Sequence, residues 1–297
     1  MKKLIIIDGN ALVHRAFHAL PPLKTKKGEL VNAVYGFASI LFRVIKDLNP
    51  DYIVATFDLA GPTFRDIEYK EYKAKRVKGP QELYDQFPLV KKVISVLEIP
   101  IYEKKGFEAD DLIGTIVATM RAKKPNVRNI IVTGDLDVLQ LVDKNTEVYT
   151  LKRGIKDTMV YDEGAIMERY GLKPNQVTSF KGLKGDPSDN ILGVPGVGEK
   201  TAINLIKEFG SLNKLYDKLE ESDLNPKLKA RLLEYKEQAF FSQKLATIKC
   251  DVTIGFKLSD CRWAKSDKVQ ERVKENIIKL LQKMNFKTLV TRLEDIF

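Results

Sequence analysis

The sequence is poor in cysteine, which excludes one common framework and one common kind of metal site. Only Cys250 and Cys261 occur among the 297 residues. Two cysteines cannot form a disulfide framework, and their spacing is not that of zinc ligands. We therefore interpret both as packing residues of a protein that resides in a reducing compartment.

Long hydrophobic runs are also missing, and no apolar stretch approaches the length of a membrane span. The first apolar run, residues 4–7, is followed at once by Asp8 and Gly9, which argues against a secretory signal. The sequence contains no internal repeat and no low-complexity segment. These absences leave the cytoplasm as the predicted location, with no membrane partner.

What the chain has in excess is positive charge. It carries 50 Lys and Arg against 40 Asp and Glu, a formal net charge of +10. With 44% apolar and 30% charged residues it is otherwise an ordinary globular sequence, long enough for one large domain or two smaller ones. The excess points to a polyanionic partner, although a generic basic surface would give the same count.

Short apolar runs alternate with helical patterns in the first half of the chain. We expect buried strands at residues 3–7, 52–57 and 129–132, and further strands at residues 99–102, 148–151 and 158–161. Alternation of this kind predicts an α/β fold with a mostly parallel central sheet flanked by helices. From about residue 162 the pattern is helical. We therefore divide the chain into an α/β part, 1–170, and a helical part, 171–297. The last long helix of the helical part carries a core stripe formed by Val269, Val273, Ile277, Leu280, Leu281 and Met284.

Acidic residues follow three of the predicted strands. Asp8 and Asp58 come directly after two of them, and Asp135 and Asp137 follow the run at 129–132. Any one of them is a normal helix cap or turn residue. Together they indicate a ligand site, because ligands of open α/β sheets bind outside the carboxyl ends of the strands. The carboxylates of such a cluster repel one another, and bound cations would compensate their negative charge.

A fourth group of acids opens a predicted helix in the segment GFEADDLIG, residues 106–114. Glu108, Asp110 and Asp111 precede the apolar positions of that helix. Acids in a first turn suit the positive end of the helix dipole, and this explanation suffices when the segment is taken alone. The alternative is a divalent-metal site built from hard carboxylate oxygens. The acids at the strand ends favour this alternative, because they could supply further ligands.

The loop at residues 181–198, KGLKGDPSDNILGVPGVG, interrupts the helical part. Asp186 and Asp189 lie three residues apart, so a helical turn would bring them together. Gly193, Gly196 and Gly198 then lead into a helix predicted at 199–209. Backbone N–H groups at a glycine-led helix start form a ready anion site, although such a turn is often a simple connection.

A basic stretch at residues 64–78, FRDIEYKEYKAKRVK, interleaves cations with Tyr69 and Tyr72. The usual explanation for a run of charges is a solvated helix face. Aromatics between cations are, however, what binding of a single-stranded nucleic acid requires.

Six motifs in their order along the chain resemble the bacterial 5′-nuclease family, which comprises the 5′→3′ exonuclease domain of DNA polymerase I and stand-alone flap endonucleases. They are IIIDGN, ATFD, FRDIEYKEYKAKR, GFEADDLIG, VTGDLDVLQLV and GLKGDPSDNILGVPGVGEKTA, and the resemblance runs from about residue 2 to residue 292. It implies a nuclease fold with a basic arch around 62–82 and a helix–hairpin–helix at 181–210. The implied activity is metal-dependent hydrolysis of phosphodiester bonds at or near 5′ ends of flap or forked DNA, in replication, repair and RNA primer removal.

The resemblance also implies roles for single residues. The metal ligands would be Asp8, Asp58, Glu108, Asp110, Asp111, Asp135, Asp137, Asp186 and Asp189, with the 58/108/110 group at a first cation, the 135/137/186/189 group at a second, and Asp110 or Asp111 near both. Lys73 and Arg76 would hold the scissile phosphate as catalytic residues. The implied DNA contacts are these two cations together with Arg15, Tyr72, Gly193, Gly196, Gly198, Lys200 and Thr201. The implied cofactors are two Mg²⁺ ions, with Mn²⁺ as a substitute, and K⁺ at the hairpin.

Other functions stay open on the residues alone. An aspartyl-phosphate phosphatase would start with a strand and Asp8 but would need a second acid at position 10, where Asn10 stands. A DNA-binding module without catalysis is disfavoured by the presence of all nine acids. A nuclease acting on RNA is the nearest rival, and the hairpin favours DNA. We expect a monomer, either a stand-alone nuclease or the amino-terminal domain of a polymerase.

Overall fold

The computed structural model describes residues 1–124, 126–151, 158–263 and 266–297. Its centre is a six-stranded sheet with the order β3-β2-β1-β4-β5-β6. The strands are β1 (Lys2–Asp8), β2 (Tyr52–Thr56), β3 (Ile101–Tyr102), β4 (Val127–Thr133), β5 (Thr146–Leu151) and β6 (Thr158–Tyr161). All neighbours pair in parallel except β5 and β6, which are antiparallel. The predicted α/β fold with a mostly parallel sheet is confirmed.

Strand β1 lies in the middle of the sheet because it is apolar on both faces. Ile5 and Ile7 contribute to the core on one face, whereas Leu4 and Ile6 contribute to the core on the other. Since β2 and β4 flank β1 in parallel, their carboxyl ends meet at one edge of the sheet. This edge is the place where open α/β sheets bind their ligands.

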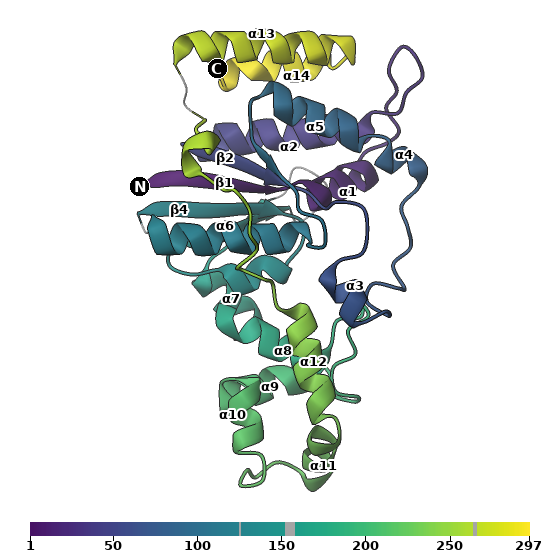
Figure 1. Ribbon diagram of the computed structural model, residues 1–297, viewed down its shortest axis with the longest axis vertical. Helices are drawn as coiled ribbons and strands as arrows, with labels where there is room; N and C mark the ends of the chain where they lie inside the picture. Colours follow the sequence, from purple (N-terminus) through teal and green to yellow (C-terminus); the bar gives the residue numbers. More distant parts are fainter. Residues whose placement is uncertain (125, 152–157, 264–265) are drawn as a thin grey trace.

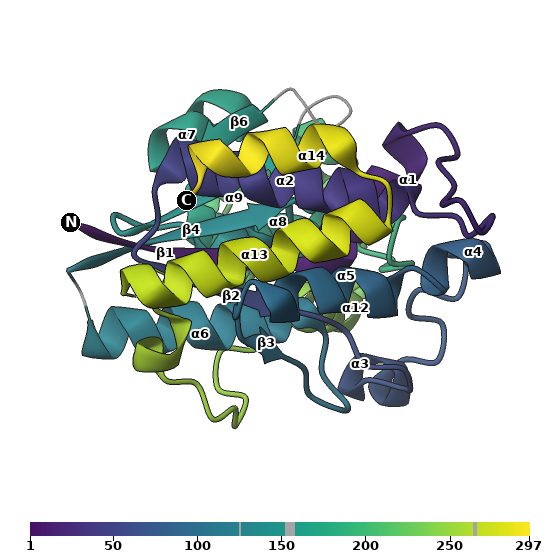
Figure 2. The ribbon, with the colours of Figure 1, turned by 90° about the horizontal axis from the view of Figure 1, so that it is seen from above.

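Helices cover both faces of the sheet (Figure 1). One face carries α1 (Gly9–Ala19), α2 (Asn32–Leu48) and α5 (Phe87–Val96), and the other carries α6 (Ala109–Lys123) and the 3₁₀ turn η1 (Asp137–Leu141). Helices α13 (Asp267–Lys283) and α14 (Lys287–Arg292) form an outer layer over α2 and α5, which Figure 2 shows from above.

A second, smaller core lies in the helical half of the molecule. It is formed mainly by residues of α8 (Val177–Lys184), α9 (Glu199–Phe209), α10 (Leu212–Asp217), α11 (Pro226–Glu234) and α12 (Lys236–Ala246). Helix α7 (Glu163–Tyr170) instead packs Ile166 into the core beneath the sheet. The predicted helix at 199–209 is confirmed by α9.

The end of the chain differs from the expected single helical part at 171–297. Helix α13 returns to the α/β half, because its stripe of Val273, Ile277 and Leu281 is buried in the same core as α2 and α5. The stripe was predicted, but its packing partner was not, since a helical periodicity indicates which face is buried and not what covers it.

The basic stretch at 64–78 is mostly not helical. Helix α3 covers only Phe64–Glu68, and α4 (Gln81–Tyr84) begins after it, with turns between them. The remaining 3₁₀ turns are η2 (Pro174–Gln176), η3 (Leu258–Cys261) and η4 (Leu293–Asp295). In the part of the chain that the structure describes, none of the helices combines the length and the apolar character needed to cross a membrane.

Candidate active site

A cavity of about 300 Å³ opens at the carboxyl edge of the sheet. Seven of the nine predicted acids line it together with Lys73 and Arg76. The acids are Asp8, Asp58, Glu108, Asp110, Asp135, Asp137 and Asp189. They come from the ends of β1, β2 and β4, the start of α6 and the loop after α8, so segments far apart in the sequence converge here.

The acids at the ends of β1 and β2 are held by helix starts. Asp8 caps α1 by accepting a hydrogen bond from the Ala11 amide at 3.0 Å, and it accepts another from the Thr133 hydroxyl at 2.6 Å. Asp58 accepts one from the Ala109 amide, in the first turn of α6, at 2.6 Å. Burial, with the nearby charges of Asp58 and Asp135, raises the pKa of Asp8 to about 7. The capping and ligand interpretations of these acids are therefore compatible.

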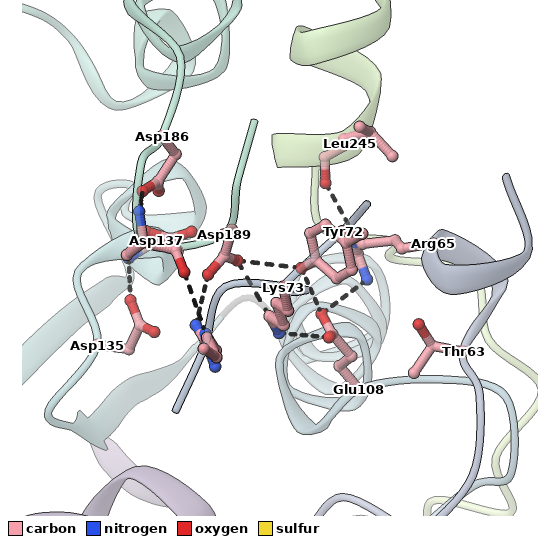
Figure 3. A network of polar contacts seen from close by, with 12 residues as sticks. Thr63, Arg65, Tyr72, Lys73, Glu108, Asp135, Asp137, Asp186, Asp189 and Leu245 are labelled. Carbon is pink, nitrogen blue, oxygen red and sulfur yellow. Dashed lines mark hydrogen bonds and ion pairs between the residues drawn. The ribbon is translucent and has the colours of Figure 1, made fainter. Parts of the chain in front are cut away.

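Glu108 precedes α6 and collects three donors. Arg65 and the Tyr72 hydroxyl each donate to Oε2 at 3.1 Å, and the Lys73 ammonium contacts Oε1. Figure 3 shows these side chains turned toward one another. The carboxylate is thus saturated by the protein's own cations and hydroxyl.

Asp110, two residues further, is in the opposite condition. Its carboxylate faces the cavity. Within the described ranges, no side chain forms a hydrogen bond or an ion pair with it. Burial and the nearby charges of Asp135, Asp8 and Asp137 raise its pKa well above the usual value. Among the acids of the cavity, it is the one most clearly in need of a cation.

Asp111, unlike Asp110, does not line the cavity. It is fully buried and pairs with Arg65 through two bonds, at 2.8 and 2.9 Å. It also accepts hydrogen bonds from the backbone amides of Glu108 and Lys249, at 3.1 and 2.9 Å. With both oxygens occupied in this way, Asp111 belongs to the scaffold of the site.

The acids after β4 are linked to the loop after α8 by Lys181. Its ammonium contacts Asp137 and lies 2.7 Å from Asp186 Oδ2. Burial together with Asp135 raises the pKa of Asp137 to about 6, although Lys181 opposes this rise. Asp186 is also half-buried, but Lys181 and Ser188 outweigh that effect and lower its pKa to about 2. Asp186 itself does not line the cavity.

Asp189 ties the basic stretch to the loop after α8. Its backbone carbonyl accepts from the Lys73 amide at 2.9 Å, and its carboxylate contacts Arg76 and the Tyr72 hydroxyl. Lys73 adopts a left-handed backbone, with φ of 54°, at this junction. The side chain of Arg76 is 48% exposed, so it can reach toward a substrate while still contacting Asp189.

Tyr72 has a different position from the predicted one. We expected an aromatic side chain available to DNA, but Tyr72 is only 5% exposed. Its hydroxyl joins Glu108 and Asp189, at 3.1 Å from each carboxylate (Figure 3). Its ring packs with Ile191 and Leu245, and the residue also lines the cavity.

The predicted hairpin lies between α8 and α9. Gly193 and Gly196 have positive φ, of 63° and 76°, and a Cβ on Gly193 would lie 2.2 Å from the Gly185 amide. Gly198 caps α9, which then presents Lys200 on the exposed surface and Thr201 partly exposed. Arg15 lies apart from the hairpin, where its guanidinium donates to the Leu151 carbonyl at 2.8 Å.

Sequence reasoning missed several residues of the site. Arg65 is 2% exposed, and besides Asp111 and Glu108 it donates to the carbonyls of Leu245 and Thr247. Lys181, at the start of the loop at 181–198, pairs with Asp137 and Asp186. His14, in α1, also lines the cavity. The available signal was the acidic cluster itself, since so many carboxylates require internal cations.

The donor set fits divalent cations, although the acids are not arranged around one. Within the described ranges, no group of three or more Asp, Glu, His or Cys side chains could hold a metal ion as it stands. The reason is visible in the contacts: Lys73, Arg76 and Lys181 occupy Glu108, Asp189, Asp137 and Asp186. These carboxylates already contact a cationic side chain, whereas Asp110 contacts none in the described part of the chain. Hard carboxylate oxygens of this kind suit ions such as Mg²⁺.

Comparison with known proteins identifies the family of the chain. Residues 3–171 match the model of the 5′-3′ exonuclease N-terminal resolvase-like domain, and residues 172–269 match that of the 5′-3′ exonuclease C-terminal SAM fold. DNA polymerase I of Bacillus subtilis is 42% identical over 292 residues, which cover 98% of this chain and 32% of that protein. The chain thus spans about a third of the length of the curated relatives that it matches.

Solved structures share the fold. A bacteriophage T5 5′-exonuclease with bound zinc ions has a TM-score of 0.67 and 22% identity, covering 95% of this chain and 100% of that one. The T5 D15 flap endonuclease, in a complex with DNA and metal ions, has a TM-score of 0.67 and 21% identity over 96% of this chain and 100% of that one. Together with the two domain matches, which cover residues 3–269, these likenesses establish that the chain belongs to the 5′-3′ exonuclease family.

Proposed function

We propose that this member of the 5′-3′ exonuclease family cleaves phosphodiester bonds at or near 5′ ends in flap or forked DNA, as in replication, repair and the removal of RNA primers. The observation that carries the proposal is the cavity at the carboxyl edge of the sheet, where seven acids meet Lys73 and Arg76. An acidic cavity in a chain of net charge +10 suits an enzyme that needs cations to act on a polyanion.

Two divalent cations, Mg²⁺ or Mn²⁺, are the proposed cofactors. When bound, such a pair activates a water and stabilises the leaving oxygen of an in-line displacement. Asp58, Glu108 and Asp110 would hold one ion, and Asp135, Asp137, Asp186 and Asp189 the other. The T5 flap endonuclease, which shares the fold, was solved with DNA and metal ions, and this supports the assignment.

The cations of the protein have a separate task. Lys73 and Arg76 reach the cavity from one turn of chain, and a phosphate entering there would compete with Glu108 and Asp189 for them. An ammonium and a guanidinium at this place would neutralise the negative charge that grows in the transition state. We assign the exposed backbone at Gly196 and Gly198, with Lys200 and Thr201, to the duplex, and K⁺ to the same hairpin. Arg15, the monomeric state and the cytoplasmic location stay predictions.

The decisive experiment is cleavage of a 5′-labelled flap duplex in Mg²⁺, in EDTA, and with Asp137→Asn. We expect cleavage only by the wild type in Mg²⁺, with products that locate the cut near the base of the flap. Asp47→Asn, an exposed acid on α2, is the matched control for loss of one negative charge and should cleave normally. Binding of the flap without cleavage would contradict the nuclease, and cleavage in EDTA would contradict the metal mechanism. A second substrate with an RNA flap shows whether the enzyme cleaves ribose and deoxyribose flaps at different rates.

A further inference from the structure

Among the cations that contact the acids of the site in the described residues, Lys181 is enclosed more than Lys73 and Arg76 and less than Arg65. It lies in the last turn of α8, its side chain is 13% exposed, and its ammonium bridges Asp137 and Asp186. Asp137 follows β4, whereas Asp186 belongs to the loop after α8, so the lysine joins the sheet edge to the helical half. The side chains of Asp137 and Asp186 are 24% and 14% exposed.

A buried ammonium is stable only where carboxylates compensate it. Here two carboxylates do so, and these are two of the acids that the proposed function gives to the second divalent cation. One lysine leaves the pair with a net charge of −1, and Asp135 is close enough to contribute to the pKa rise of Asp137. A divalent ion would neutralise the pair completely. It would also repel the ammonium, because like charges on the same oxygens oppose each other.

We propose that Lys181 is a built-in substitute for the second divalent cation. In the metal-free protein it holds Asp137 and Asp186 together across the two halves, and it must leave them before an ion can bind there. The inference rests on the proposed function, because it concerns the same acids. Lys73 differs, since its side chain is 25% exposed and its closest contact is to one acid, Glu108.

The first test compares Mn²⁺ binding by Lys181→Met with binding by the wild type, followed by the electron paramagnetic resonance signal of free Mn²⁺. We expect the weaker of two Mn²⁺ sites to gain affinity in the variant on the order of tenfold, because no ammonium must be displaced. The matched control is Lys184→Met, which removes the same charge three residues later in the same helix end. Lys184 pairs with the exposed Glu199 at 3.1 Å, so its loss should change Mn²⁺ affinity by about twofold or less.

The second test is thermal melting of the metal-free protein in EDTA. Lys181→Met should melt below both the wild type and Lys184→Met, and saturating Mn²⁺ should remove the difference. Lys181→Arg keeps a cation and should retain the weak Mn²⁺ affinity of the wild type. If Lys181→Met is unfolded in EDTA, recovery of its fold on adding Mn²⁺ supports the inference, and failure to recover overturns it.

The outcomes separate this inference from the proposed function. Two-site Mn²⁺ binding by the wild type, with equal or weaker binding by Lys181→Met, would overturn the role of Lys181 and leave the metal mechanism intact. If the wild type binds no Mn²⁺, the proposed metal mechanism fails first and the inference falls with it.

Discussion

Two neighbouring residues at the start of α6 divide the site into two regions with opposite electrostatics. Asp110 faces a cavity in which acids crowd one another, and Asp111 faces a buried junction in which every acid oxygen has a partner. One step along a helix turns a side chain by about 100°. That rotation separates a group available to ligands from one that is part of the framework.

The contrast between the surroundings of Asp110 and Asp111 explains how the protein stays folded with an acidic cavity. The junction of Arg65, Asp111 and Glu108 fastens α3 and α6 to the end of α12 through the Leu245 carbonyl. Because the charges of these residues are compensated within the junction, it can hold the cavity acids close together despite their repulsion. Stability is concentrated on one side of the α6 start, and reactivity on the other.

The largest expected effect is on activity, from Asp110→Asn. Loss of this carboxylate should lower kcat by about 10³-fold, or ~4 kcal/mol, because a charge that serves the transition state is missing. The metal-free variant should melt at the same temperature as the wild type or higher, since one repelling charge is removed. Flap cleavage in Mg²⁺ and melting in EDTA measure the two effects. Normal activity of Asp110→Asn would contradict the distinction between a reactive cavity and a structural junction.

The neighbouring variant, Asp111→Asn, should behave in the opposite way. It leaves the buried Arg65 without its bidentate partner, and we expect a loss of about 3 kcal/mol in the free energy of unfolding. Urea denaturation in EDTA measures this loss. At a temperature where the variant is folded, it should retain much more activity than Asp110→Asn. An Asp111→Asn protein that is stable but inactive would indicate instead that Asp111 is a metal ligand.

Sequence reasoning predicted the sheet and most of the cavity for a physical reason. Parallel strands are apolar throughout, and an acid at the carboxyl end of each one necessarily lies at the same edge. Asp8, Asp58, Asp135 and Asp137 were therefore placed by the strands that precede them. Helix periodicity likewise gave the start of α6 and the whole of α9.

Pairings between distant segments were beyond that reasoning. Arg65 lies in a charged run and Lys181 at the start of a glycine-rich loop, and only the folded chain shows which acids they contact. The burial of Asp111 was not predicted either, although the structure places it on the same buried face of the helix as Thr115, one turn later. The burial of Tyr72 was not predicted, because an aromatic between lysines indicates DNA contact as readily as packing.

A smaller effect on activity is expected from Lys73→Met, which tests whether a cation at the boundary of the two regions acts on the substrate. Cleavage should slow by about 30-fold, or ~2 kcal/mol, while the Kd for a flap duplex changes little. The exposed neighbour Lys75 provides the control, since Lys75→Met should alter neither value appreciably. Weaker binding with an unchanged rate of cleavage would reassign Lys73 to general DNA affinity.

The smallest effect is expected far from both regions, at the hairpin. Lys200 is exposed in the first turn of α9, where it can meet a phosphate of the duplex. Lys200→Ala should weaken duplex binding about fivefold, irrespective of base sequence, and reduce the slope of log K against log salt by about 1, because one fewer counterion is released. Cleavage at saturating substrate should be unchanged, since Lys200 does not line the cavity. Fluorescence anisotropy at several salt concentrations measures the slope, and an unchanged slope with slower cleavage would connect the hairpin to the chemistry of the cavity.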